Sequence, residues 1–259
     1  MKIEFDETVH KCPCCGGKKQ LLFWMGQDTL YGTALEYVAC PVCGVRYLKE
    51  RMSEEAIRKF YGEAYRSEYV KSLTGYSEEW DTRRQNARYE LMLKALKQAK
   101  PDFVPSTCMD IGCDTGLFAK AIQKEWKDCR CYGMEWNEEH SLIALRQGVY
   151  TVNSWEAVST IRFDLVTLSH VLEHMNDPLK ELKKIIKGMA KGGILIIEVP
   201  NAETYQSAYA PVHPIAFTNE ALQALITKAG FKVVTAFTHP GLMQFPIGYY
   251  LGVIAEKEE

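Results

Sequence analysis

The chain has 259 residues, of which 47% are hydrophobic and 25% are charged. These proportions are typical of a folded globular protein and exclude extensive disorder and low-complexity repeats. The formal net charge of −2 gives no indication of a nucleic-acid partner, and the longest apolar stretch, residues 245–255, is shorter than the roughly 20 residues of a membrane span. The acidic first ten residues do not resemble a signal peptide, so we expect a cytoplasmic protein with reduced cysteines.

Five of the nine cysteines lie in the first 43 residues, where the pattern C-P-x-C-G occurs twice. Each copy places two thiolates in a tight turn, and four thiolates suit a structural, tetrahedral zinc ion. The ligands predicted from the repeated pattern are Cys12, Cys15, Cys40 and Cys43. Cys14 is interpreted as a bystander, and residues 1–50 as a zinc ribbon with strands at 21–25 and 36–39. The alternative is a set of ordinary thiols or a redox pair, which the repetition disfavours.

Residues 51–105 are predicted to form a helical linker. Ser53 is a suitable N-cap for a first helix that ends at Gly62, and a Tyr-rich stretch without period covers residues 61–76. A second helix is predicted over residues 79–100. Its predicted apolar face consists of Ala87, Leu91, Ala95 and Leu96. The helix also carries Arg83, Arg84 and Arg88. We interpret these arginines as a solvent-exposed face rather than as a ligand-binding one.

From residue 106 onward, strands alternate with helices, which predicts a doubly wound α/β sheet covered on both faces. The predicted strands are residues 107–111, 130–134, 163–168, 194–199, 232–237 and 247–255. The predicted helices are residues 116–126, 138–147, a helix from Pro178 capped by Asp177, and residues 220–229. Ligands of such sheets bind beyond the carboxyl ends of the strands. The residues that follow each strand are therefore the candidate site.

A glycine loop follows the first predicted strand. Gly112 and Gly116 allow a tight turn and a close approach of a ligand to the backbone. A dinucleotide fingerprint would require a glycine where Asp114 stands. Asp110 and Asp114 instead suit a ligand that carries a cation.

The second predicted strand ends at Glu135, which is placed to bind both hydroxyls of a ribose. Trp136 beside it offers a flat face for a purine. A solvated acid is the alternative interpretation of Glu135 alone, but the adjacent glycine loop disfavours it. A nucleoside with a cationic tail indicates S-adenosylmethionine as the cofactor.

Four segments resemble the signature segments of class I S-adenosylmethionine-dependent methyltransferases: residues 110–116, Glu135, residues 163–174 and residues 191–200. The resemblance covers residues 106–259 and implies a Rossmann-like, seven-stranded mixed sheet. It implies that the glycine loop holds the methionine portion, although Asp114 replaces the usual glycine, and that Glu135 takes the ribose hydroxyls. The resemblance places Asn153 and Ser154 near the adenine. It places Ser169 and His170 beside the methyl group.

The ribbon and the linker together resemble a subgroup of small-molecule methyltransferases from sugar and polysaccharide biosynthesis. This resemblance implies methyl transfer to a small hydroxylated metabolite such as a sugar or a sugar nucleotide. One alternative is an RNA base methyltransferase in which the ribbon recognises RNA. Another is a non-catalytic interaction protein with a vestigial core. The sequence predicts no membrane association and gives no prediction of the oligomeric state.

Three histidines are candidate catalytic bases. His170 and His174 follow the strand at 163–168, and Glu173 can orient one of them; the alternative for His174 is packing under the next helix. His213 lies in the long loop at residues 201–217, and we interpret it as a base or a substrate anchor. The alternative is a simple turn residue.

The remaining histidines, His10, His140 and His239, are interpreted as surface residues. Related ubiquinone-pathway O-methyltransferases hold a divalent metal ion with the pattern E-x-x-E-H. His170 replaces the first acid of that pattern here, so we expect no magnesium site.

Overall fold

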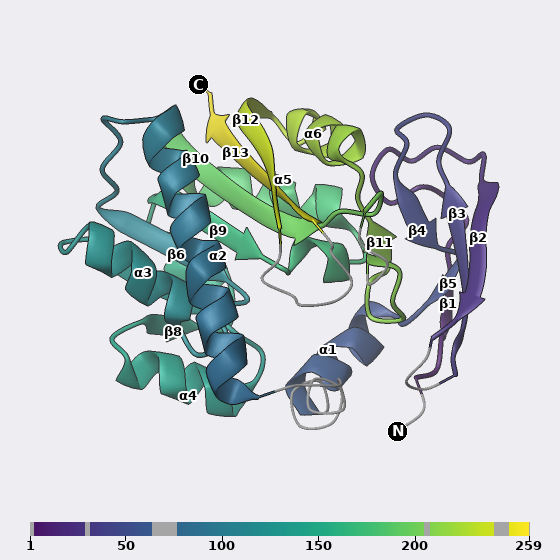
Figure 1. The fold of residues 1–259 in the computed structure, drawn as a ribbon, viewed down its shortest axis with the longest axis horizontal. Coiled ribbons are helices and arrows are strands. Elements are labelled where there is room, and N and C mark those ends of the chain that lie inside the picture. The colour runs from purple at the N-terminus through teal and green to yellow at the C-terminus, as the bar shows by residue number, and fades with distance from the viewer. Residues whose placement is uncertain (1–2, 29–31, 64–76, 205–207, 241–248, 259) are drawn as a thin grey trace.

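The structure is a computed structural model that describes residues 3–28, 32–63, 77–204, 208–240 and 249–258 (Figure 1). Three parts of the sequence discussed above lie outside these ranges: Tyr205 in the long loop at residues 201–217, most of the Tyr-rich stretch, and the first residues of the last predicted strand. In the part of the chain that is described, every helix is too short or too polar to cross a bilayer.

A seven-stranded mixed sheet forms the centre, in the order β12-β13-β10-β9-β6-β7-β8. Its strands are β6 (Thr107–Ile111), β7 (Arg130–Met134), β8 (Tyr150–Val152), β9 (Phe163–Ser169), β10 (Met189–Pro200), β12 (Phe231–Pro240) and β13 (Tyr249–Lys257). β13 runs antiparallel to both of its neighbours, whereas β8, β7, β6, β9 and β10 are parallel. The predicted Rossmann-like mixed sheet is confirmed.

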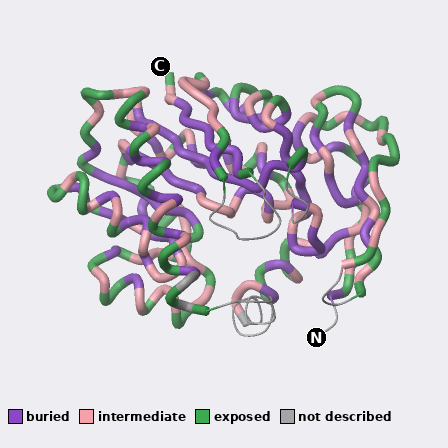
Figure 2. The backbone as a smooth tube through the Cα atoms, viewed as in Figure 1, coloured by how far each residue is buried: buried purple, intermediate pink, exposed green. Residues whose placement is uncertain are grey.

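Helices cover both faces of this sheet, and the sheet itself is the most buried part of the molecule (Figures 1 and 2). One face packs against α2 (Glu78–Ala99), α3 (Leu117–Glu125) and α4 (Glu138–Arg146). The other packs against α5 (Pro178–Gly188), α6 (Asn219–Lys228) and part of the ribbon. Neighbouring strand residues point to opposite faces, so Leu165 and Val166 belong to different cores, as expected for a sheet buried on both sides.

The buried face of α2 agrees only in part with the predicted one. Leu96 is buried and Ala95 packs against the core as predicted, but Leu91 is 40% exposed. Met92 and Leu93, which were not predicted, are buried between α2 and the sheet. Arg88 is also buried, so its interpretation as a solvated residue is wrong. The helix packs by the face that meets α3 and the sheet, and the buried residues of the helix include two charged ones, Asp81 and Arg88, that an apolar stripe cannot reveal.

The ribbon consists of two small sheets. The larger has the order β11-β4-β3-β2 and contains β2 (Leu21–Gln27), β3 (Ala34–Ala39), β4 (Arg46–Leu48) and β11 (Ile215–Ala216). The smaller pairs β1 (Glu7–Thr8) with β5 (Glu50–Arg51). β11 comes from the segment between β10 and α6, so the ribbon sheet includes a strand from the carboxyl-terminal part of the chain.

Two further segments lead into the site. The helix α1 (Glu54–Glu63) follows the ribbon and extends one residue past Gly62. A 3-10 turn, η3 (Leu172–His174), follows β9, and a second 3-10 turn, η2 (Glu156–Val158), follows β8. The helix α5 begins as predicted, because Asp177 accepts a hydrogen bond from the backbone N–H of Lys180 at 3.0 Å and Pro178 occupies the first turn.

Candidate active site

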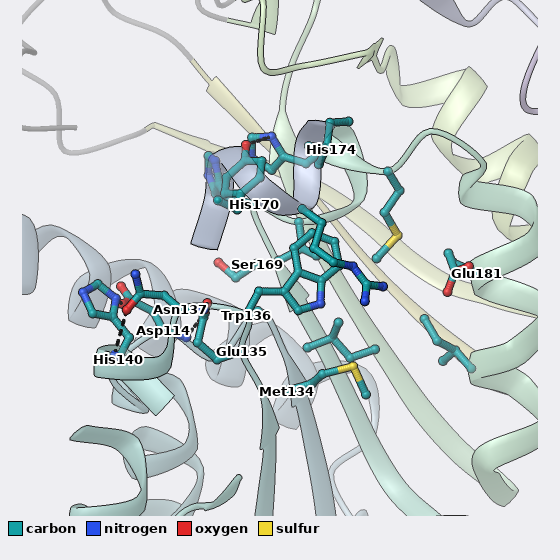
Figure 3. A pocket seen from close by; sticks show the side chains of 18 of the residues that line it. Asp114, Met134, Glu135, Trp136, Asn137, His140, Ser169, His170, His174 and Glu181 are labelled. Atoms are coloured by element: carbon teal, nitrogen blue, oxygen red, sulfur yellow. Dashed lines mark hydrogen bonds and ion pairs between the residues drawn. The ribbon is translucent and has the colours of Figure 1, made fainter. Parts of the chain in front are cut away.

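A cavity of about 470 Å³ lies at the carboxyl ends of β6, β7 and β9, with walls from α1, α2 and α5 (Figure 3). Its volume falls within the range of roughly 300–1,000 Å³ that is usual for small-molecule sites. Seven of the residues predicted to bind the cofactor line this cavity: Gly112, Asp114, Glu135, Trp136, Asn153, Ser154 and Ser169. Doubly wound sheets bind their ligands at this edge.

The carboxylate of Glu135 is held by two backbone N–H groups. Oε1 accepts a hydrogen bond from Asn137 at 2.7 Å, and Oε2 accepts one from Asp114 at 3.0 Å. Burial raises the pKa of Glu135, and the hydrogen bond from Asn137 opposes that shift. A carboxylate has about four acceptor positions, so Glu135 keeps capacity for hydroxyl donors in the cavity.

The glycine loop approaches the cavity with its backbone. Gly112 has a φ of 70°, and a Cβ atom there would lie 2.4 Å from Cγ2 of Val171, so a larger residue does not fit. Asp114 adopts a φ of 49°, a left-handed conformation that aspartate tolerates better than most residues. Its Oδ1 lies 2.5 Å from Nδ1 of His140, a histidine that also lines the cavity. The interpretation of His140 as a surface residue is therefore wrong.

Two residues of the predicted glycine loop do not reach the cavity. Asp110 is buried within β6 and accepts a hydrogen bond from the Thr167 hydroxyl at 2.6 Å. Its burial raises its pKa to about 7, with a smaller contribution from the charges of Glu135 and Asp114. Gly116 caps α3 with a φ of 86°. The predicted contact of Asp110 with a cationic ligand is thus corrected to a buried position that links two strands.

Aromatic and polar side chains also line the cavity near Glu135, in addition to the glycine loop and His140. Trp136 is 45% exposed, and the guanidinium of Arg58 lies 5.4 Å from its ring centroid. Asn153 and Ser154 follow the short strand β8 and line the same cavity. A planar base would find an indole face and amide or hydroxyl partners in this region.

His170 follows β9 in a left-handed conformation with a φ of 55°. Its backbone N–H donates to the carbonyl oxygen of Glu198 at 2.8 Å, and its Nδ1 lies 3.3 Å from Oε1 of Glu173. Burial and the charge of Arg88 hold the pKa of His170 well below its ordinary value. The imidazole is therefore neutral near neutral pH and can accept a proton.

A buried ion pair supports this part of the site. Nε of Arg88 donates to Oε2 and Oε1 of Glu198 at 3.0 and 3.2 Å, and Nη2 donates to the Ser169 hydroxyl at 2.8 Å. His239 places Nε2 2.8 Å from Oε1 of Glu198 and is 5% exposed, so its interpretation as a surface residue is wrong. Burial alone would raise the pKa of Glu198, but the charge of Arg88 and the hydrogen bonds from His239 and Arg88 together outweigh it and hold the pKa well below its ordinary value.

The other two candidate bases lie side by side. The rings of His174 and His213 are 4.7 Å apart, and His174 lines the cavity. Nδ1 of His174 lies 2.7 Å from the carbonyl oxygen of Val212 and also contacts the Tyr61 hydroxyl of α1. Glu173 lies between His170 and His174 in the sequence and is 1% exposed. Burial raises its pKa to about 8.

The four cysteines of the two C-P-x-C-G copies converge in the ribbon, with their sulfur atoms all within 4.8 Å of one another. Cys12 Sγ lies 3.5 Å from Cys43 Sγ, and Cys15 Sγ lies 3.4 Å from Cys40 Sγ. Zinc–sulfur bonds of about 2.3 Å in a tetrahedron separate the sulfurs by slightly less than 4 Å. The cluster therefore fits a zinc ion. Cys14 is buried outside the group.

The two turns that carry these cysteines share one backbone arrangement. Gly16 donates its N–H to the carbonyl of Cys12, and Gly44 donates to that of Cys40, each at 2.8 Å. Both glycines have a positive φ, of 79° and 74°. The repeated sequence pattern thus corresponds to a repeated structure, as a pair of zinc knuckles requires.

The fold and the cavity together define the class I methyltransferase architecture. Residues 82–236 match the family described as "Methyltransferase domain". The match covers more than half of the chain, which therefore belongs to this family and is an S-adenosylmethionine-dependent methyltransferase.

Two curated proteins and one solved structure illustrate the similarity. The chain is 26% identical over 168 residues to 2-phytyl-1,4-naphtoquinone methyltransferase of Trichormus variabilis, covering 58% of this chain and 69% of that protein. It is 35% identical over 81 residues to tRNA U34 carboxymethyltransferase of Wolinella succinogenes, covering only 28% of this chain and 29% of that protein. The N-methyltransferase NodS from Bradyrhizobium japonicum, in complex with S-adenosyl-L-homocysteine, superposes with a TM-score of 0.57 at 14% identity, covering 75% of this chain and 98% of that one. At this identity, the superposition shows a shared fold.

Proposed function

We propose that this chain transfers a methyl group from S-adenosylmethionine to a nucleophilic atom of a small hydroxylated metabolite, with sugars and sugar nucleotides as the first acceptors to examine. The observation that carries the proposal is the shared cavity. Glu135 with Asp114 and His140 lies on one side of it, and the neutral His170 with His174 lies on another (Figure 3).

The residues around Glu135 fit the nucleoside part of the cofactor. Its carboxylate is oriented by two backbone N–H groups toward a cavity that hydroxyl donors can enter. Trp136 supplies an exposed indole face, and Asp114 supplies a carboxylate next to the glycine loop. When bound, S-adenosylmethionine supplies a methyl group on a sulfonium leaving group.

The residues around His170 fit the acceptor. A neutral imidazole within the cavity can accept a hydroxyl proton, which typically contributes a factor of about 10² to 10⁴ to the rate. The Arg88–Glu198 pair beneath it fixes the Ser169 hydroxyl and the strand end from which His170 emerges. His170 is therefore proposed as the general base.

The charges of the cavity walls support a small acceptor rather than RNA. Its walls carry acidic side chains, including Glu54 and Glu181, as well as basic ones, and a net charge of −2 offers no excess of cations for a phosphate backbone. The naphtoquinone methyltransferase relative acts on a small molecule by its name, and the tRNA-modifying relative matches less than a third of this chain. We therefore propose the small-molecule function ahead of the RNA function.

Cofactor binding is tested by calorimetry with S-adenosylmethionine. Glu135→Gln is expected to weaken binding by at least about tenfold, because a charge-assisted hydrogen bond contributes roughly 1.5–3 kcal/mol. Glu139→Gln on the exposed surface of α4 is the matched control and is expected to bind like the wild type. Absence of binding heat in the wild-type protein would refute the proposal.

Methyl transfer is tested with labelled cofactor and a panel of sugars, sugar nucleotides and other hydroxylated metabolites, with transfer RNA as a separate arm. His170→Asn is expected to lower turnover by about 10²-fold or more while leaving cofactor affinity unchanged. His10→Asn, an exposed histidine, is the control. Labelling of RNA alone would replace the small-molecule proposal by the RNA function.

A further inference from the structure

We propose that Glu173, His174 and His213 form a binding site for one divalent transition-metal ion beside His170. This site is separate from the four-cysteine cluster of the ribbon. It combines η3, which follows β9, with a residue from the segment between β10 and α6.

The three side chains converge closely enough to share one ion. One possible ligand atom from each residue lies within 4.8 Å of the other two. Nε2 of His174 is 3.9 Å from Oε1 of Glu173. Metal–nitrogen and metal–oxygen bonds of about 2.0–2.2 Å separate the ligands of one ion by roughly 3–4 Å. Small side-chain adjustments therefore suffice for coordination.

The tautomer of His174 is suited to a metal ligand. Nδ1 lies 2.7 Å from the carbonyl oxygen of Val212, which can only accept a hydrogen bond, so Nδ1 carries the proton. The lone pair then resides on Nε2, the nitrogen on the side of Glu173. Histidines that bind metals commonly donate their other ring N–H to a carbonyl in this way.

Glu173 is a buried carboxyl group that needs a partner. It is 1% exposed, and neither of its oxygens has a hydrogen-bond partner among the described residues. Its nearest nitrogen neighbours belong to His170 at 3.3 Å and His174 at 3.9 Å. A buried polar group without a hydrogen-bond partner is costly, and coordination of a cation by the carboxylate offsets that cost.

The donor set also indicates which kind of ion fits. Two imidazoles and one carboxylate favour first-row transition metals over magnesium, which prefers oxygen ligands. Three protein ligands leave coordination positions open, and His174 lines the cavity. An oxygen atom of the acceptor or a water molecule can occupy such a position.

Cobalt(II) titration of the full-length, zinc-loaded protein tests the site. We expect one Co²⁺ per chain by calorimetry, with weak visible absorption and none of the intense thiolate charge-transfer bands that cobalt in the ribbon would give. Glu173→Gln and His213→Asn are each expected to weaken binding by at least tenfold. His10→Asn, which removes an exposed imidazole, is expected to leave binding unchanged.

Two results would overturn the proposal: no Co²⁺ bound beyond the ribbon, or binding of equal affinity in both variants and the wild type. Circular dichroism checks that each variant is folded, and either folded variant decides the question alone. His174→Gln replaces them if neither is folded. Because neither methyl donor nor acceptor is present, the outcome is independent of the proposed methyl transfer.

Discussion

Replacement of Arg88 by methionine removes the positive partner of the buried Glu198. Arg88 is 4% exposed and Glu198 is 0% exposed, and the pair shares at least two Nε–carboxylate hydrogen bonds of 3.0 and 3.2 Å. Leaving one charge of such a pair without its partner typically costs about 3–5 kcal/mol. We therefore expect the free energy of unfolding of Arg88→Met to fall by that amount, a large share of the roughly 5–15 kcal/mol that a domain possesses.

Urea unfolding followed by circular dichroism measures this loss. Arg83→Met is the matched control, because Arg83 lies on the same helix with a 76% exposed side chain paired to Glu79, and we expect a change within about 0.5 kcal/mol. The double variant Arg88→Met/Glu198→Gln no longer contains the buried charge. It should recover part of the loss, with a coupling of about 2 kcal/mol or more. Equal stability of Arg88→Met and Arg83→Met would refute the reasoning.

Two further predictions concern stability. Asp110 has a pKa of about 7 when folded and an ordinary value of 3.8, so its stabilising contribution is full below pH 4 and is lost as the pH rises toward 7. Asp110→Asn should therefore gain a few kcal/mol relative to the wild type between pH 4 and pH 7 in urea unfolding, and a constant difference across that range would contradict the assignment. Removal of zinc from the four cysteines by a chelator should lower the thermal midpoint by at least about 6 °C, which corresponds to a loss of at least roughly 1.5–3 kcal/mol for a chain of this size. An unchanged midpoint in protein shown to be zinc-free would exclude a structural ion.

Local sequence signals predicted the elements that position Glu135 and the glycine loop at the cavity. The bounds of β6 and β7 agree with the apolar runs at 107–111 and 130–134, because each run is followed directly by glycine or a polar residue that ends the strand. The start of α5 follows from Asp177 and Pro178, whose capping roles depend only on neighbouring residues. The residues after these strands could therefore be assigned to one edge of the sheet from the sequence alone.

The electrostatic partners around His170 could not be predicted in the same way. Arg88 and Glu198 are 110 positions apart, and their pairing depends on how α2 crosses the sheet. His239 reaches Glu198 although β13 lies between β12 and β10 in the sheet, so the order of the strands in the sequence does not indicate the contact. A histidine near the end of a strand carries no local signal that distinguishes this buried position from a surface one. The three-residue strand β8 was likewise too short to produce a recognisable pattern.

The ribbon contacts the segment around His213 through its strands rather than through its cysteines. The hydroxyl of Tyr37 on β3 donates to the carbonyl oxygen of His213 at 2.6 Å, and the backbone N–H of Leu48 on β4 donates to that of Pro214 at 3.0 Å. β4 then pairs with β11, immediately after this turn. These bonds fix the backbone at and directly after His213, whose ring lies against that of His174. Since the four cysteines lie in the turns that flank this sheet, a metal ion bound there would stabilise the sheet that positions His213.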